Sequence, residues 1–186
     1  MKLLGIAGKK RSGKDTVASI IFEQYPNVQV MAFATRMKDI CASTFGVPIA
    51  LFYDQSVKEI KISGWKMSPR EMMTTMDGAI KGTYGADFFV RVIQQEYERL
   101  NALDYPDSPN ILIITDVRFD AEAEWLKSVG GKIIQVTRPT DEKTDHSTHW
   151  SETGFNKKHI DYVINNDSSL DNLQNNIYKL LKSAIL

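Results

Sequence analysis

Residues 8–16 read Gly-Lys-Lys-Arg-Ser-Gly-Lys-Asp-Thr, between an apolar run at 3–7 and a helix-forming stretch at 17–22. A strand, a glycine-rich turn and a helix in this order form the context of a phosphate-binding loop, or P-loop. The glycines let successive backbone N–H groups point at phosphate oxygens, and the following helix N-terminus adds favourable partial charge. Lys14 would reach the β- and γ-phosphates of a nucleotide such as ATP. The expected phosphate ligands are Gly8, Lys10, Arg11, Ser12, Gly13, Lys14, Asp15 and Thr16.

The loop departs from the usual P-loop pattern at one position. A Ser or Thr normally follows the lysine, but here Asp15 follows it and the hydroxyl comes at Thr16. A magnesium ion would be held through Thr16 or Asp15, directly or through a bound water. The competing interpretation is an ordinary strand-to-helix turn with surface lysines. That interpretation explains poorly why two glycines and four cations crowd one turn.

Composition narrows the classes of protein that the chain can represent. Its 186 residues fit one domain, and the 42% of hydrophobic residues suffice for a core. Lys plus Arg and Asp plus Glu both number 23, so a broad nucleic-acid footprint is not expected. The single cysteine, Cys41, suits a reducing cytoplasm. No apolar run approaches the roughly 20 residues of a membrane span, and the start reads directly into a strand rather than a signal peptide.

Short runs rich in Ile, Val and Leu alternate with helical patterns along the chain. This alternation predicts an α/β fold with a mostly parallel five-stranded sheet flanked by helices. The expected strands are 2–7, 28–33, 111–115, 132–137 and 161–165. The expected helices are 14–25, 35–45, 69–76, 87–100, 120–129 and 169–183. Residues 48–66 show no clean period and are expected to be an irregular insertion over the site.

The carboxyl ends of the strands are the expected ligand-binding edge, as in other open α/β sheets. Residues 8–14, 33–38, 116–118 and 138–145 should line this rim. Residues 111–116 read Ile-Leu-Ile-Ile-Thr-Asp, so a buried strand would carry Asp116 to the rim, where it could hold a magnesium-bound water. Arg118 could clamp a phosphoryl group on the same rim. The alternatives are a helix cap for Asp116 and a surface ion pair for Arg118.

Further cations and aromatic residues are candidates for binding a phosphorylated acceptor. Arg36 and Lys38 follow the second strand, where an acceptor would approach a nucleotide in the P-loop. Arg70 lies at the start of one predicted helix, and Arg91 lies within another. Two side chains are candidates for stacking on a base, although aromatic residues more often belong to the core: Phe33 and Trp150.

A polar segment, 140–153, follows the predicted fourth strand. Such a segment could close over the site as a lid that excludes water. Arg138, which precedes it, is expected at the adenine or at the transferring phosphate. A zinc site from His146, His149 and an acid is disfavoured, because no cysteine and no HExxH spacing accompany them.

Seven short segments, which occur in order along the chain, resemble the deoxynucleoside monophosphate kinases of large tailed phages. Asp-Val-Arg-Phe at 116–119, which Glu122 and Ala123 accompany, and His-Trp-Ser-Glu at 149–152 are the more specific of them. The others are 8–16, 32–34 with Lys38, 68–71, 85–90 and 136–139. The resemblance covers nearly the whole chain. It implies a single P-loop kinase domain over 1–186, with an acceptor-binding insertion at 46–100 and a lid-like segment at 138–158.

The resemblance also implies the reaction, which is magnesium-dependent transfer from ATP to a deoxynucleoside monophosphate in the host cytoplasm. It assigns Gly13, Lys14, Asp15 and Thr16 to ATP and magnesium, and Lys38, Arg70 and Trp150 to the acceptor nucleotide. A homodimer is a candidate assembly, since family members are often dimers. One departure concerns residues 73–78, which read Met-Thr-Thr-Met-Asp-Gly where a Gln and a Gly-Thr pair are expected. Base selectivity therefore does not transfer from the family.

In-line transfer of the γ-phosphoryl group assigns catalytic roles to four residues. Lys14 would neutralise the β- and γ-oxygens, Asp116 would lie in the outer shell of the magnesium ion, and Arg118 and Arg138 would stabilise charge on the moving group. A kinase for another phosphorylated metabolite is the nearest alternative, because residues 8–15 are similar to the loop of animal-type phosphomevalonate kinase. A nucleotide-binding switch is disfavoured because no Asn-Lys-x-Asp motif is present.

Overall fold

The computed structural model describes residues 1–103, 109–139 and 155–184, which fall into two compact units. Unit 1 contains residues 1–31 and the chain from Gln94 onward, and unit 2 contains Ala32–Ile93. The boundary falls within the long helix α5 (Phe88–Asn101). The predicted division into one domain with an insertion at 46–100 and a lid at 138–158 stays a prediction.

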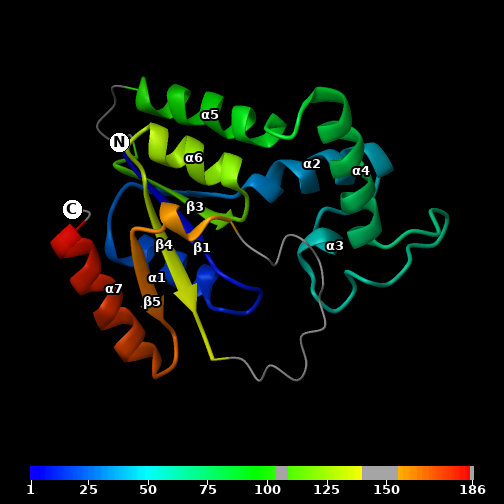
Figure 1. Ribbon diagram of the computed structural model, residues 1–186. Helices are drawn as coiled ribbons and strands as arrows, with labels where there is room; N and C mark the ends of the chain where they lie inside the picture. Colours follow the sequence, from blue (N-terminus) through cyan, green and yellow to red (C-terminus); the bar gives the residue numbers. More distant parts are fainter. Residues whose placement is uncertain (104–108, 140–154, 185–186) are drawn as a thin grey trace. The chain divides into compact units, whose positions relative to one another are not determined.

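Unit 1 is built on a five-stranded sheet in the order β2-β3-β1-β4-β5 (Figure 1). Its strands are β1 (Lys2–Ala7), β2 (Val28–Met31), β3 (Ile111–Val117), β4 (Lys132–Thr137) and β5 (Tyr162–Asn165). Every neighbouring pair is parallel. The predicted parallel α/β fold is therefore confirmed, and β1 lies at its centre with β3 and β4 on either side.

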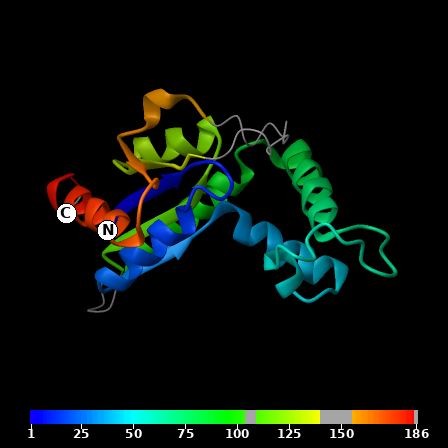
Figure 2. The same cartoon turned by 90° about the horizontal axis from the view of Figure 1, so that it is seen from below.

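Helices cover both faces of this sheet (Figures 1 and 2). The helices α1 (Lys14–Gln24) and α7 (Leu170–Ala184) pack together over one face, where Ile6, Ile113 and Ile134 are fully buried. The other face is covered by α6 (Asp120–Ser128). Gly5 faces α6, and a Cβ atom there would lie 2.8 Å from Leu126 Cδ1. The missing side chain lets α6 approach the central strand closely.

Unit 2 is helical. It holds α2 (Phe33–Phe45), α3 (Ala50–Tyr53), α4 (Pro69–Tyr84) and the start of α5. Both α2 and α3 contact α4, and Phe52 and Met72 are fully buried. The start of α4 is a capping box, in which Ser68 Oγ accepts from Glu71 N at 3.2 Å and Ser68 N donates to Glu71 Oε2 at 2.7 Å.

Several element boundaries differ from those expected. Helix α4 continues to Tyr84 rather than ending near residue 76, because exposed glycines inside a helix cost only about 1 kcal/mol each. Strand β2 ends at Met31, since α2 begins at Phe33. Strand β3 runs through Val117, so Asp116 lies within the strand, one residue before its end, rather than after it. Residues 48–66 are mostly irregular but contain α3.

None of the helices within the described ranges has the length and apolar character required to span a bilayer.

Candidate functional site

The loop between β1 and α1 begins at Gly8, a position that has no room for a side chain. Gly8 has a φ of 148°. A Cβ atom at this position would lie 2.4 Å from the Val136 carbonyl oxygen and 2.6 Å from Ser12 Oγ. The chain can therefore leave the sheet beside β4 and turn at once, which brings the loop over the carboxyl end of the central strand.

Two further residues of the loop adopt left-handed backbone conformations. Arg11 has a φ of 63°, and Gly13, the N-cap of α1, has a φ of 100°. Alternation of left- and right-handed residues forms the concave backbone nests that bind anions. Because the N-cap is a glycine, no side chain caps the first turn of α1. The loop and helix start thus have the geometry of an anion site.

The Lys14 side chain folds back over the same loop. Its ammonium group donates to the Gly8 carbonyl at 2.7 Å and to the Lys9 carbonyl at 2.8 Å. These contacts hold a positive charge above the backbone that would surround a phosphate. Lys10 and Arg11 are exposed beside it. The predicted gathering of loop cations is therefore present in unit 1.

Asn166, far along the sequence, contacts the loop at 8–16. Its Nδ2 donates to the Ser12 carbonyl at 2.9 Å, and its backbone N–H donates to the Thr137 carbonyl at 2.7 Å. Ser12 is 2% exposed, and its hydroxyl has no hydrogen-bond partner among the described residues. Sequence reasoning missed Asn166. The available signal was a pair of asparagines, Asn165 and Asn166, at the end of the fifth strand, on the ligand-binding edge of the sheet.

The strand register brings the predicted rim residues of unit 1 to one edge. Ala7 pairs with Val117 of β3 and with Gln135 of β4, so the segments that begin at Gly8, Arg118 and Arg138 leave neighbouring strands on the same side. Arg118 is half-buried and Arg138 is exposed. Within the described parts of the chain, neither arginine makes an ion pair. Both arginines therefore follow strands at the edge of the sheet where the loop at 8–16 begins.

Glu122 supports the segment that carries Arg118. Its Oε2 accepts from the Arg118 backbone N–H at 2.6 Å and from the Phe119 N–H at 3.1 Å, and the residue is 6% exposed. A carboxylate at this place satisfies N–H groups at the start of α6. Sequence reasoning quoted Glu122 only as part of a motif and gave it no role. Its spacing of three residues from Phe119 is the signal for a capping contact.

The carboxylates proposed as metal ligands lie on two elements of unit 1. Asp116 is half-buried in β3, and Asp15 and Thr16 are exposed in the first turn of α1. Asp15 lines a hollow of about 330 Å³ along α1 together with Thr115 of β3. In the described part of the chain, no three His, Cys, Asp or Glu side chains form a metal-binding group. Magnesium bound to phosphates needs only one or two protein carboxylates, so this donor set fits it.

The cations expected to bind the acceptor all belong to unit 2, and each has a contact within that unit. Arg36 lies 4.0 Å from Asp39, and the Lys38 ammonium lies 3.6 Å from the centre of the Tyr53 ring. Arg70 pairs with Glu59. Arg91 lies 3.6 Å from Asp87 and donates to the Tyr84 carbonyl. Phe33 is 5% exposed, as a core side chain would be. The acceptor roles of these residues stay predictions.

Some predicted residues lie outside the described part of the chain. These are Trp150, His146, His149 and most of the lid-like segment, 138–158.

Similarity to known proteins gives a second line of evidence beside this geometry. The family model for deoxynucleotide monophosphate kinase matches residues 50–177. The chain belongs to this family. The predicted resemblance is therefore confirmed. The matched range excludes residues 8–16, so the geometry of this loop is an observation independent of the family model.

Two curated relatives extend the similarity over the whole chain. A putative deoxynucleotide monophosphate kinase of Acanthamoeba polyphaga mimivirus is 28% identical over 192 residues, covering 99% of this chain and 98% of the relative. The deoxynucleotide monophosphate kinase of Enterobacteria phage T4 is 28% identical over 242 residues, covering 98% and 99%. Among solved structures, dephospho-CoA kinase from Campylobacter jejuni is similar, with a TM-score of 0.57, 13% identity and coverage of 98% and 96%. This last likeness concerns the fold.

Proposed function

We propose that the protein transfers the γ-phosphoryl group of ATP to a deoxynucleoside monophosphate, which yields ADP and the deoxynucleoside diphosphate. The observation that carries the proposal is the loop at 8–16, with its left-handed Arg11 and Gly13 and the Lys14 ammonium above it. Membership of the deoxynucleotide monophosphate kinase family supplies the acceptor class.

In this reaction an oxygen of the acceptor phosphate attacks the γ-phosphorus, and the bond to the β,γ-bridging oxygen breaks to release ADP. The acceptor phosphate is already an anion near neutral pH, so a strong general base is not needed. Lys14 and the backbone N–H groups of the loop bind the β- and γ-phosphates. Arg118 and Arg138 stabilise the charge that develops on the transferring group.

A bound magnesium ion would supply positive charge that offsets the charge of the phosphates. The residues that would hold it are Thr16, Asp15 and Asp116, directly or through water. The oxygen chemistry of this set suits a hard cation. The acceptor would be bound by Arg36, Lys38, Arg70 and Arg91, with Phe33 and Trp150 as candidate stacking residues.

The remaining proposals concern the setting of the reaction. The substrates are small-molecule nucleotides, and we expect no nucleic-acid or membrane partner. We expect the protein to be a homodimer and to act in the host cytoplasm. Size-exclusion chromatography with light scattering tests whether it is a dimer.

An ADP-release assay tests the function. ATP, magnesium and the protein are combined with dTMP, dGMP, dCMP, dAMP, their ribose counterparts or phosphomevalonate. We expect acceptor-dependent ADP release with one or more deoxynucleotides. Release with phosphomevalonate alone, or no acceptor-dependent release at all, would reject the proposal. Because residues 73–78 depart from the family pattern, the base preference must be read from the panel.

A further inference from the structure

Asn166 holds one particular peptide of the phosphate-binding loop. Its Nδ2 donates to the Ser12 carbonyl at 2.9 Å, across 154 positions of sequence. Its own place is set by the backbone bond from its N–H to the Thr137 carbonyl at 2.7 Å, directly after β5. The asparagine amide is therefore fixed between the end of β4 and the loop.

The loop is shaped to admit this amide. A Cβ atom on Gly13 would lie 2.3 Å from Asn166 Nδ2 and 3.4 Å from its Cγ. Any side chain at position 13 would therefore displace the asparagine from the Ser12 carbonyl. Gly13 serves two purposes, since it adopts a φ of 100° and leaves room for Asn166.

The contact determines where a neighbouring N–H group points. The Ser12 carbonyl and the Gly13 N–H belong to the same planar trans peptide, so they point in opposite directions. While Asn166 holds the carbonyl on its own side, the Gly13 N–H must face the other side. The Ser12 carbonyl also stays turned toward a donor rather than toward an anion, which its oxygen would repel.

We propose that Asn166 is a positioning residue for nucleotide binding, which orients the Ser12–Gly13 peptide so that its N–H faces the phosphates. The inference rests on the proposed function insofar as the bound anion is the triphosphate of ATP. Asn166 acts through the peptide and makes no contact with the nucleotide in this scheme.

The substitution Asn166→Asp tests the inference, because it keeps the shape and replaces the amide donor by a carboxylate that repels the Ser12 carbonyl. We expect the Kd for ATP, measured by calorimetry without acceptor at pH 8, to rise by about 10-fold or more. A carboxylate that faces the Ser12 carbonyl oxygen in this part-buried position should have a pKa above the usual value of about 3.9, and its protonation restores a donor. The ratio of variant to wild-type Kd should therefore fall as the pH is lowered toward 5, which a purely structural defect would not produce.

Asn165→Asp is the matched control. It adds the same charge one residue away, and Asn165 already accepts from Thr137 Oγ1 at 2.6 Å, a bond that a carboxylate retains. The control should bind ATP within about 2-fold of wild type. Equal losses of ATP affinity in the two variants would show that the added charge alone causes the effect, and would overturn the inference. A ratio of Asn166→Asp to wild-type Kd that does not change with pH would also overturn it.

A second variant keeps the test decisive where Asn166→Asp fails to fold, as judged by circular dichroism. Asn166→Ala removes the donor without adding charge, and we expect a Kd about 3- to 10-fold above wild type with no recovery at low pH. Wild-type affinity in this variant overturns the inference. The proposed function fails separately, if wild-type protein binds ATP but phosphorylates no acceptor; the calorimetric comparison then still decides the role of Asn166.

Discussion

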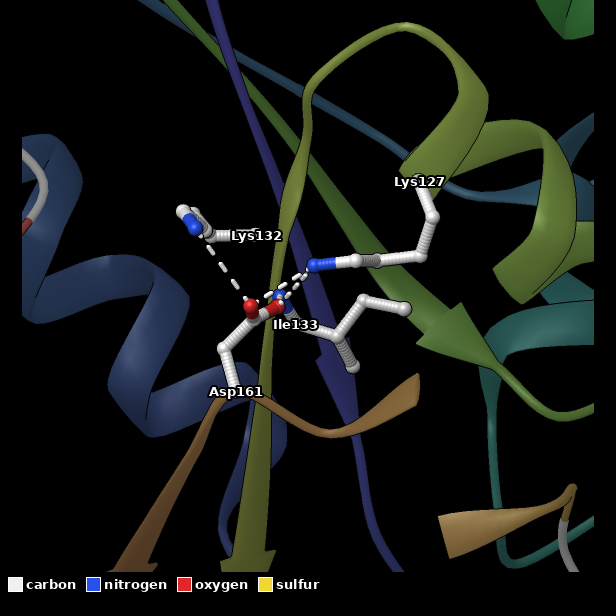
Figure 3. A network of polar contacts seen from close by, with 4 residues as sticks. All are labelled: Lys127, Lys132, Ile133 and Asp161. Atoms are coloured by element: carbon white, nitrogen blue, oxygen red, sulfur yellow. Dashed lines mark hydrogen bonds and ion pairs between the residues drawn. The ribbon is translucent and has the colours of Figure 1, made fainter. Parts of the chain in front are cut away.

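The Lys127 ammonium donates to both carboxylate oxygens of Asp161, at 2.6 and 2.8 Å (Figure 3). Asp161 precedes β5, and its Oδ2 also accepts from the Ile133 backbone N–H at 2.8 Å. Lys132 lies 3.5 Å from Oδ1. The carboxylate side chain is 16% exposed. This contact links the end of α6 to the start of β5, and Asn166 at the other end of β5 contacts the loop at 8–16.

The Asp161 network should make stability depend on pH. Partial burial raises the pKa of Asp161, but the hydrogen bonds from Lys127 and Ile133 and the nearby positive charges outweigh it and hold the pKa below its usual value. A depressed pKa stabilises the fold above the unfolded-state pKa of about 4, and this stability is lost as the pH falls through the folded-state value. Asp161→Asn should therefore reduce the unfolding free energy at pH 7 and flatten its decline below about pH 4. Urea unfolding across pH measures both, and an unchanged acid profile would contradict the assignment.

The two lysines of this network should differ in importance. Lys127→Met removes the bidentate contact, and we expect a loss of about 1–3 kcal/mol at pH 7 because it leaves a partly buried carboxylate with its main partner missing. Lys132 is more exposed and more distant, so Lys132→Met should cost about 0–1 kcal/mol. Thermal and urea unfolding measure the stability of the two variants. Equal losses of stability would show that the distances of the two lysines from Asp161 do not reflect the strength of their interactions.

Lys14→Ala should abolish most of the phosphoryl transfer without unfolding the protein. The ammonium donates to the loop carbonyls of Gly8 and Lys9, and removal of a charge that binds the transferring phosphates typically costs about 10³-fold or more in rate. The coupled ADP assay measures kcat and KM. Lys9→Ala, which removes an exposed loop lysine, should stay within about 3-fold of wild type. Near-wild-type turnover of Lys14→Ala in folded protein would contradict the mechanism.

Glu122→Ala should reduce both stability and activity. It removes a buried carboxylate that accepts from Arg118 N and Phe119 N, and we expect about 1–3 kcal/mol lower stability. The backbone that carries Arg118 loses its support, so kcat should fall as well. Glu124→Ala is the control on the same helix; its side chain is 61% exposed, and its stability should change by less than about 0.5 kcal/mol. Urea unfolding and the ADP assay distinguish the two.

Gly13→Ala should impair ATP binding through a steric clash as well as backbone strain. Its Cβ would lie 2.3 Å from Asn166 Nδ2, and its φ is 100°. Gly46→Ala is the matched control, since Gly46 has a φ of 62° but no atom within 4 Å of its would-be Cβ. Both variants should lose about 1 kcal/mol or more of stability from left-handed strain. Only Gly13→Ala should weaken ATP binding in calorimetry; equal affinities in the two variants would argue against the close fit of the loop around Asn166.

The local elements of the fold could be predicted because neighbouring residues encode them. The start of α1 follows from Gly13, the capping box at Ser68 begins α4, and the apolar runs mark all five strands within a few residues. Boundaries were less predictable. The spacing of Gly78 and Gly82 does not indicate that α4 continues past them to Tyr84. Both glycines are exposed, and each costs the helix only about 1 kcal/mol.

The sequence by itself determined the glycine-rich loop at 8–16, the alternation of strands and helices, and the kinase family that the segments resemble. These are properties of contiguous residues, in which backbone conformation and periodicity are set locally. Only the tertiary structure decided that Asn166 meets Ser12, that Asp161 meets Lys127, and that Glu122 supports the backbone of Arg118. The first two contacts depend on the strand order β2-β3-β1-β4-β5, which hydrophobic periodicity leaves open because every buried parallel strand reads alike. The third depends on how the turn before α6 folds back on its own first turn.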